Sequence, residues 1–146
     1  MQLSENGLNL IKGFENCDLM AYLDQGGRST IGYGHLNKER FVTITQEQAD
    51  ALLESDCSAA VNCVNANVTV PLNQNQFDAL TSLVFNIGSG NFINSTLLND
   101  LNEKEYDCAA EQFLVWNKVT NSETGELEVS NGLIARREKE KQLFLS

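Results

Sequence analysis

The stretch GFENCDLMAYLDQGGRSTIGYGHLN, residues 13–37, decides the fold and contains most of the candidate chemistry. It holds Glu15, Asp24, Thr30 and the chain's only histidine, His35, together with five of the ten glycines. Carboxylates, a hydroxyl and permissive backbone in so short a segment indicate one of two things. The segment is either an exposed, turn-rich hairpin or part of an active site.

The middle of this segment has the pattern of a β-hairpin. Asp24-Gln25-Gly26-Gly27 predicts a turn, and residues 28–36 predict one short strand. Because side chains alternate along a strand, Thr30, Gly32 and Gly34 fall on one face of it. That nearly bare face suits either a bulky ligand lying against the backbone or a glycine-weakened edge strand.

The remainder of the chain has helical periodicity. Ser4 caps a first helix that Gly13 and the following residues end, and Thr45 with Gln48 resembles a capping box. Asn73 caps a further helix, which Gly88 and Gly90 stop. The expected helices cover residues 4–13, 45–64, 73–88, 95–101, 103–116 and 132–144, with a loop or irregular hairpin over 117–131.

This order of elements predicts an α+β fold. We expect a single domain over residues 1–146, in which a small lobe with a short antiparallel sheet covers about residues 14–45. The mostly helical lobe is the remainder, and an active-site cleft lies between the two lobes.

Composition excludes several classes of function. A formal charge of −10 over 146 residues argues against nucleic acid as a partner, since phosphate binding needs clustered Lys and Arg. No apolar run is long enough for membrane insertion, and the first residues do not resemble a secretory signal.

The cysteines do not indicate a metal centre. There are four of them, no CxxC pair and one histidine, so we expect neither a zinc site nor any other cofactor. The even number permits two disulfides among Cys17, Cys57, Cys63 and Cys108, and Cys57 falls on the apolar face of its predicted helix.

Glu15 and Asp24 have a spacing that suits paired catalysis only across two elements. On one helix, nine positions would turn them to opposite sides. At a helix end and a hairpin, respectively, they can face each other, as glycoside hydrolysis requires. Thr30 is then placed to hold a water molecule. By themselves, a Glu and an Asp in such a hairpin are far more often ordinary surface charges.

A wider pattern distinguishes these readings. Glu15, eight residues, Asp24, five residues and Thr30 reproduce the catalytic spacing of phage-type lysozymes, glycoside hydrolase family 24. The words GFE, AYLD and TIGYGH, then FNIGSGNFINSTLL at 85–98, FLVWNK and GLIARREKEKQLF, also resemble that family.

The resemblance implies a lysozyme-like fold and cleavage of the β-1,4 bond between N-acetylmuramic acid and N-acetylglucosamine. Glu15 would be the general acid, and Asp24 and Thr30 would hold the attacking water, which gives inversion of the anomeric configuration. An inverting enzyme separates its two carboxyl groups by roughly 6.5–9.5 Å.

The same matching implies further site residues. Leu36, Phe85, Ser95 and Asn117 would contact the substrate. Three more residues would support the site. His35 is expected to pair with a carboxylate, Asp56 being the first candidate, while Arg136 or Arg137 would approach Glu15, unless these two arginines merely lie on the surface of a basic final helix.

The expected partner is therefore the peptidoglycan glycan strand, bound by a monomer. We expect an endolysin stored in the host cytoplasm before lysis and released through a separate pore. The alternatives are a non-catalytic peptidoglycan-binding protein and an injected bacterial effector with the same fold.

Overall fold

The computed structural model describes residues 1–23, 28–37 and 42–146. These residues divide into two compact units. The large unit comprises Met1–Gly7 and Ala59–Ser146, and the small unit comprises Leu8–Ser58. The small unit therefore extends past the segment 14–45 that the sequence assigns to a small lobe.

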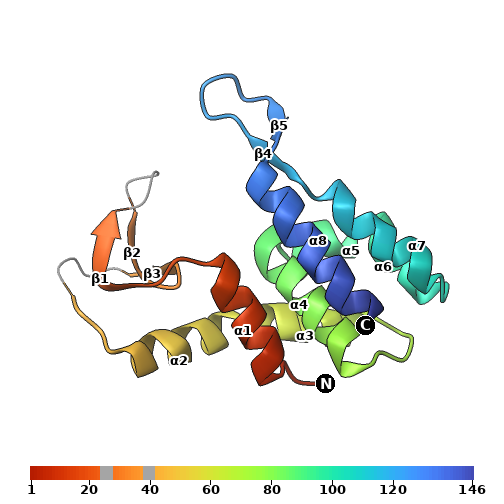
Figure 1. The fold of residues 1–146 in the computed structure, drawn as a ribbon, viewed down its shortest axis with the longest axis horizontal. Coiled ribbons are helices and arrows are strands. Elements are labelled where there is room, and N and C mark those ends of the chain that lie inside the picture. Colours follow the sequence, from red (N-terminus) through yellow and green to blue (C-terminus); the bar gives the residue numbers. More distant parts are fainter. Residues whose placement is uncertain (24–27, 38–41) are drawn as a thin grey trace. The chain divides into compact units, whose positions relative to one another are not determined.

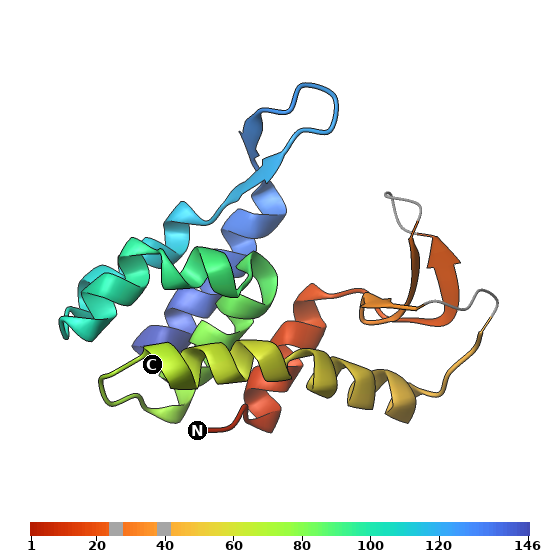
Figure 2. The same cartoon turned by 180° about the vertical axis from the view of Figure 1, so that it is seen from behind.

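The small unit combines a three-stranded antiparallel sheet with two helices (Figure 2). Its sheet has the order β1-β2-β3, and α2 packs against β2 and β3. The bounds are α1 (Glu5–Phe14), β1 (Asp18–Leu23), β2 (Ser29–Gly32), β3 (His35–Leu36) and α2 (Gln46–Asp56).

The single strand expected over residues 28–36 is wrong. Gly32 and Gly34 have φ of 63° and 79°, so the chain turns between them and forms β2 and β3 as separate strands. A Cβ on Gly32 would lie 3.4 Å from the Cβ of Ala49, so the missing side chain leaves room for α2 and not for a ligand. The edge-strand alternative is also wrong, because β2 is the central strand.

The large unit is helical apart from one small hairpin (Figure 1). Its core cluster is apolar, and α8 lies along α4. The bounds are α3 (Ser58–Asn67), α4 (Gln74–Ile87), α5 (Ser89–Ile93), α6 (Thr96–Asn102), α7 (Tyr106–Gln112), the 3₁₀ helix η1 (Phe113–Val115), β4 (Lys118–Thr120), β5 (Leu127–Val129) and α8 (Asn131–Leu145).

The helix starts agree with the capping signals. Thr45 with Gln48 and Asn73 with Gln76 form complete capping boxes at α2 and α4, and Ser95 caps α6. The hydroxyl oxygen of Ser4 accepts a hydrogen bond from the Gly7 N–H at 3.1 Å, which confirms the expected cap of α1.

Several expected helix bounds are wrong. The helix predicted over 45–64 is two helices, α2 and α3, separated at Cys57, because the apolar spacing continues across this break. Gly88 alone ends α4, with φ of 89°, whereas Gly90 lies inside α5. Lys104 has φ of 67°, so α7 begins after it and not at residue 103. The first helix, by contrast, ends at Phe14, in agreement with the expected end at Gly13 and the residues after it.

The hairpin β4–β5 resolves the alternatives left open for residues 117–131. Lys118 pairs with Val129, and Thr120 pairs with Leu127, in antiparallel register. This segment is therefore a hairpin and not an irregular loop. In the described ranges, every helix falls short of the length and hydrophobicity that a membrane span requires.

The start of α1 is attached to α4 through a buried carboxylate. Asp78 is fully buried and accepts hydrogen bonds from the Ser4 hydroxyl, from the Ser4 N–H at 3.1 Å and from the Gln74 amide at 2.9 Å. A Cβ on Gly7 would lie only 2.6 Å from the Asp78 carboxyl carbon. The close approach of the two helices thus requires glycine at position 7.

We predict that Gly7→Ala lowers the free energy of unfolding by about 1–3 kcal/mol, because the hydrogen-bonded Asp78 cannot withdraw from the added methyl group. Gly13→Ala in the same helix is the matched control, since a Cβ there meets nothing within 4 Å. The control should be neutral or gain up to about 1 kcal/mol from helix propensity. Denaturant unfolding measures both, and equal stability of the two variants would contradict the packing argument.

Candidate functional site

Glu15 lies immediately past the last residue of α1. Its N–H donates to the Ile11 carbonyl at 3.1 Å, so the backbone at Glu15 continues the helical hydrogen bonding although the helix ends at Phe14. Ile11 is fully buried. The half-buried Glu15 is consequently anchored one turn from a core residue.

Contacts from α2 and the β2–β3 turn fix the last turn of α1. The Lys12 ammonium lies 3.1 Å from the Asp50 carboxylate and 5.8 Å from the centre of the Tyr33 ring. The Gln46 amide donates to the Tyr33 hydroxyl at 3.0 Å and to Asp50 at 2.9 Å. The hydrogen bond from Gln46, followed by that from Lys12, lowers the pKa of Asp50. These contacts restrict the helix end that carries Glu15.

Thr30 lies in the central strand β2 and is 4 % exposed. It pairs with Tyr22 of β1 on one side and with Leu36 of β3 on the other. Its hydroxyl donates to the Tyr22 carbonyl at 3.4 Å. With the proton used in this way, the oxygen lone pairs of Thr30 are available to accept a hydrogen bond.

Asp24 lies outside the described residues, as does the turn expected at 24–27. The strands on both sides of it are described up to the pair Leu23 and Ser29. The expected separation of the two carboxyl groups therefore stays a prediction.

His35 and Asp56 form the expected pair. The Nδ1 atom of His35 lies 2.8 Å from Asp56 Oδ2 and 3.0 Å from Oδ1, which joins β3 to the last turn of α2. Leu36, the next residue, is 55 % exposed. The pair fixes the strand from which Leu36 projects, while the substrate contact of Leu36 stays a prediction.

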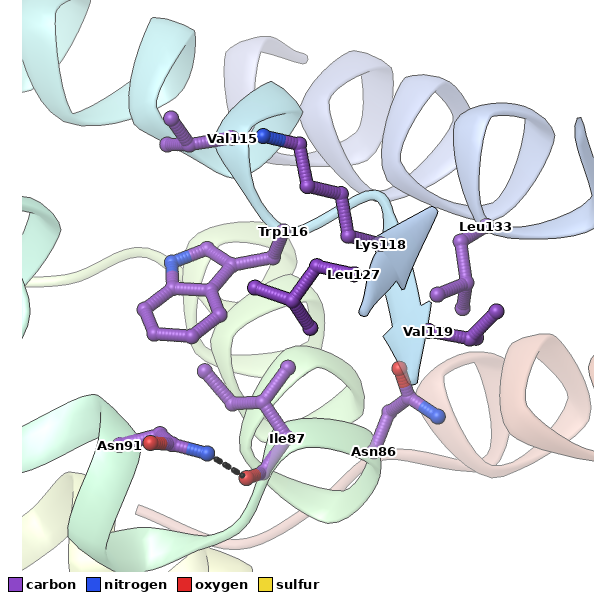
Figure 3. A pocket seen from close by; sticks show the side chains of 9 residues that line it. All are labelled: Asn86, Ile87, Asn91, Val115, Trp116, Lys118, Val119, Leu127 and Leu133. Atoms are coloured by element: carbon purple, nitrogen blue, oxygen red, sulfur yellow. Dashed lines mark hydrogen bonds between the residues drawn. The ribbon is translucent and has the colours of Figure 1, made fainter. Parts of the chain in front are cut away.

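The large unit contains a pocket of about 640 Å³ (Figure 3). Ile87, Trp116 and Leu127 turn their apolar side chains toward one another in it. Its full lining is Asn86, Ile87, Asn91, Val115, Trp116, Lys118, Val119, Leu127 and Leu133.

Two of the predicted substrate residues adjoin this pocket in sequence. Phe85 precedes Asn86, is half-buried and packs against the apolar core, and Asn117 lies between Trp116 and Lys118. Ser95 is mostly buried, and its hydroxyl donates to the Phe92 carbonyl at 2.6 Å while accepting from the Leu98 N–H at 3.1 Å. Both contacts belong to the cap of α6, and the substrate roles of all three residues stay predictions.

Arg136 and Arg137 do not lie on the surface of α8, so that alternative is wrong. Both are buried, and Arg137 is 0 % exposed. Arg137 Nε lies 2.9 Å from Glu140 Oε1, and its Nη2 donates to Asn86 Oδ1 at 2.6 Å. Arg136 donates to the Ser82 carbonyl at 3.4 Å. The expected approach of one arginine to Glu15 stays a prediction.

Glu140 is fully buried between these two arginines. Burial raises the pKa of Glu140 to about 7, and the neighbouring Arg137 and Arg136 guanidinium groups oppose that rise. A buried ion pair is expensive to desolvate, and removing one partner typically costs about 3–5 kcal/mol. Two contacts connect this cluster in α8 to α4, that of Arg136 with the Ser82 carbonyl and that of Arg137 with Asn86.

Comparison with known proteins assigns the chain to a family. The family described as Phage lysozyme matches residues 12–140. The chain belongs to the phage lysozyme family. The endolysin of Acyrthosiphon pisum secondary endosymbiont phage 1 is 46% identical over 147 aligned positions, which cover 100% of this chain and 99% of that protein.

Solved structures agree with this assignment. The endolysin from Escherichia coli O157:H7 phage FAHEc1 superposes with a TM-score of 0.92 at 41% identity, covering 100% of this chain and 94% of that one. The muramidase domain of SpmX from Asticaccaulis excentricus also gives 0.92 at 41% identity, with 99% and 98% covered. The expected lysozyme-like α+β fold is confirmed, and this phage lysozyme family member is a glycoside hydrolase.

Three residues that line the pocket of this family member or connect to it were not predicted from the sequence. Asn86 and Trp116 line the pocket, and Glu140 holds the arginine that contacts Asn86. The spacing of Arg136, Arg137 and Glu140 on one helix was the available signal. Acidic and basic residues at i, i+3 and i+4 are usually solvent-exposed, however, and this pattern does not distinguish a buried cluster.

None of the four cysteines of this lysozyme family member takes part in a disulfide bond. Cys17 and Cys108 are exposed, whereas Cys57 and Cys63 are buried, Cys57 as its helical position predicts. The two disulfides that the even number permits are therefore not formed.

We predict that four thiols react with a thiol reagent after denaturation without reductant. In the native protein, two should react rapidly and two slowly, because thiol access depends on exposure. Cys17→Ser and Cys108→Ser should each remove one rapid thiol. Fewer than four thiols after denaturation would show that a disulfide forms.

Proposed function

We propose that this chain is an endolysin that cleaves the β-1,4 bond between N-acetylmuramic acid and N-acetylglucosamine in peptidoglycan with inversion. Membership of the phage lysozyme family over nearly the whole chain carries this proposal. The endolysin relatives, which match over their full length, support it.

Glu15 is the proposed general acid. It protonates the glycosidic oxygen as the bond to C1 breaks, so that the leaving sugar departs as a neutral alcohol. Its placement at the end of α1 supports this role, because Lys12, Asp50 and Tyr33 restrain that helix end. A general acid has to be held within hydrogen-bond reach of the oxygen that it protonates.

Asp24 and Thr30 are the proposed holders of the attacking water. One water hydrogen is donated to Asp24, which takes the proton as the water oxygen bonds to C1, and the other is donated to Thr30. The Thr30 hydroxyl donates a hydrogen bond to the Tyr22 carbonyl, which leaves its oxygen to accept one from water and supports this role. After one cycle Glu15 is ionised and Asp24 is protonated, and proton exchange with solvent restores both.

The proposal includes the setting in which the enzyme acts. The endolysin is stored in the host cytoplasm before lysis, reaches the cell wall through a separate pore and acts on glycan strands as a monomer. The names of its endolysin relatives support the role in lysis.

We predict that Glu15→Gln slows clearing of purified peptidoglycan at least about 100-fold, because glutamine cannot donate the catalytic proton. Glu5→Gln is the matched control, since Glu5 is an exposed residue in the first turn of the same helix. Turbidity of a peptidoglycan suspension measures both. Equal clearing by Glu15→Gln and wild type would contradict the acid role, and binding without clearing by wild type would favour the non-catalytic alternative.

We predict that the first product carries the α-anomer at its new reducing end, because a water held opposite the leaving group inverts the β-linkage. Proton NMR of soluble glycan strands within the first minutes of cleavage detects the anomer before mutarotation. Asp24→Asn should abolish this signal, since it removes the base. An initial β-anomer would show retention and contradict the assignment of Asp24 and Thr30.

A further inference from the structure

A chain of three side chains connects the buried interior of α8 to the pocket in Figure 3. Glu140 holds Arg137 by an ion pair at 2.9 Å, and Arg137 Nη2 donates to Asn86 Oδ1 at 2.6 Å. Glu140 and Arg137 are both 0 % exposed, whereas Asn86 lines the pocket. Glu140 therefore orients Arg137, and Arg137 in turn orients the Asn86 amide at the pocket.

The chemistry of the pair determines which way the Asn86 amide is turned. A guanidinium group only donates hydrogen bonds, so Asn86 has to present its oxygen to Arg137. Its Nδ2 group is left as a donor, and no hydrogen bond within the described part of the chain uses it. The other asparagine of the pocket, Asn91, differs from Asn86, because its Nδ2 group already donates to the Ile87 carbonyl at 2.8 Å (Figure 3).

The apolar wall beside Asn86 indicates the kind of group that the pocket accepts. Ile87, Trp116 and Leu127 suit a methyl group, and the Asn86 donor suits an adjacent carbonyl oxygen. A carbonyl with a methyl group one or two bonds from its carbon occurs in the acetamido groups of the sugars and in alanine-containing peptides of peptidoglycan. The two sources share one chemistry, which is an acyl group.

We propose that Glu140 is a positioning residue, which acts through Arg137 to hold the Asn86 amide with Nδ2 ready to donate to an acyl carbonyl of peptidoglycan. This inference rests on the proposed function. A buried ion pair gains little stability over apolar side chains of similar volume, so its presence here needs another reason. Holding a donor in its binding orientation before the substrate arrives is such a reason, because it lowers the entropy cost of binding.

Asn86→Asp tests the donor directly. Aspartate keeps the oxygen that Arg137 contacts but cannot donate, so a merely structural residue would tolerate the change. We expect KM for soluble, uncrosslinked glycan strands to rise about 10-fold, with kcat within about 2-fold of wild type. Asn99→Asp makes the same charge change at an exposed position of α6 and should leave both constants unchanged.

Glu140 variants test the positioning. Glu140→Gln keeps an acceptor for Arg137 and should stay within about 3-fold of the wild-type KM, whereas Glu140→Leu should raise KM about 10-fold. Glu138→Leu, at an exposed position of α8, is the control. In the Asn86→Asp background, Glu140→Leu should raise KM no further, because both changes remove the same interaction. Additive effects would show a general structural role and overturn the proposal.

Two substrates distinguish the sources of the carbonyl. If the Asn86→Asp effect persists on strands stripped of their peptides, an acetamido group is bound, and if it appears only on peptide-bearing strands, a peptide carbonyl is bound. A wild-type KM for Asn86→Asp on both substrates overturns the inference while wild-type cleavage upholds the proposed function. Absence of cleavage by wild type would contradict the proposed function and this inference together. If Glu140→Leu does not fold, Asn86→Asp decides the donor, and Glu140→Met, which is unbranched and cannot form the ion pair with Arg137, decides the positioning by the same expected rise in KM and the same lack of any further rise in the Asn86→Asp background.

Discussion

The arrangement of the large unit depends on α4, a helix buried along its whole middle. Eight consecutive residues, from Phe77 to Val84, are buried, so the helix has neighbours on every side. Three of these residues, Asp78, Thr81 and Ser82, are polar. A polar group removed from water needs a partner, and where that partner belongs to another segment, as for Asp78, it fixes the position of that segment.

The partners of α4 account for much of the packing around it. The Thr81 hydroxyl donates a hydrogen bond to the Phe77 carbonyl of the same helix. The Asp78 carboxylate instead accepts hydrogen bonds from Ser4, just before α1. At the other end of α4, the Ser82 carbonyl and the Asn86 side chain accept from Arg136 and Arg137 of α8. The same requirement that stabilises the helix packing therefore also turns the Asn86 amide at the pocket. The helix packing and the proposed substrate donor therefore share one contact at this end of α4.

In the small unit, too, contacts between polar side chains hold the elements together. A sheet of three short strands has little area to bury, so side-chain pairs fix its position on the helices. His35 with Asp56 joins β3 to α2, and Lys12 with Asp50 joins α1 to α2. Gly32 allows α2 to approach β2 closely. The strand that carries Thr30 and the helix end that precedes Glu15 are both restrained by these contacts with α2.

The pairing of His35 with Asp56 was only a first candidate until the structure showed it, whereas the sequence by itself determined the family and the helix starts. These depend on residues close in sequence or on motif words with fixed spacing: a capping box needs only its own four residues, and the Glu15, Asp24 and Thr30 spacing is read without coordinates. The break at Cys57 could not be predicted, because the apolar period continues across it, nor could the turn between Gly32 and Gly34, because alternation suggested one strand.

Only the tertiary structure decided which charges are buried. Arg136, Arg137 and Glu140 resemble a solvated stretch of basic helix, and their burial follows from the placement of α8 on α4. The contact of Arg137 with Asn86 joins residues 51 positions apart, and no local pattern encodes it. Local propensity fixes where elements begin, whereas the requirement to satisfy buried polar groups acts between elements and is visible only once they are packed together.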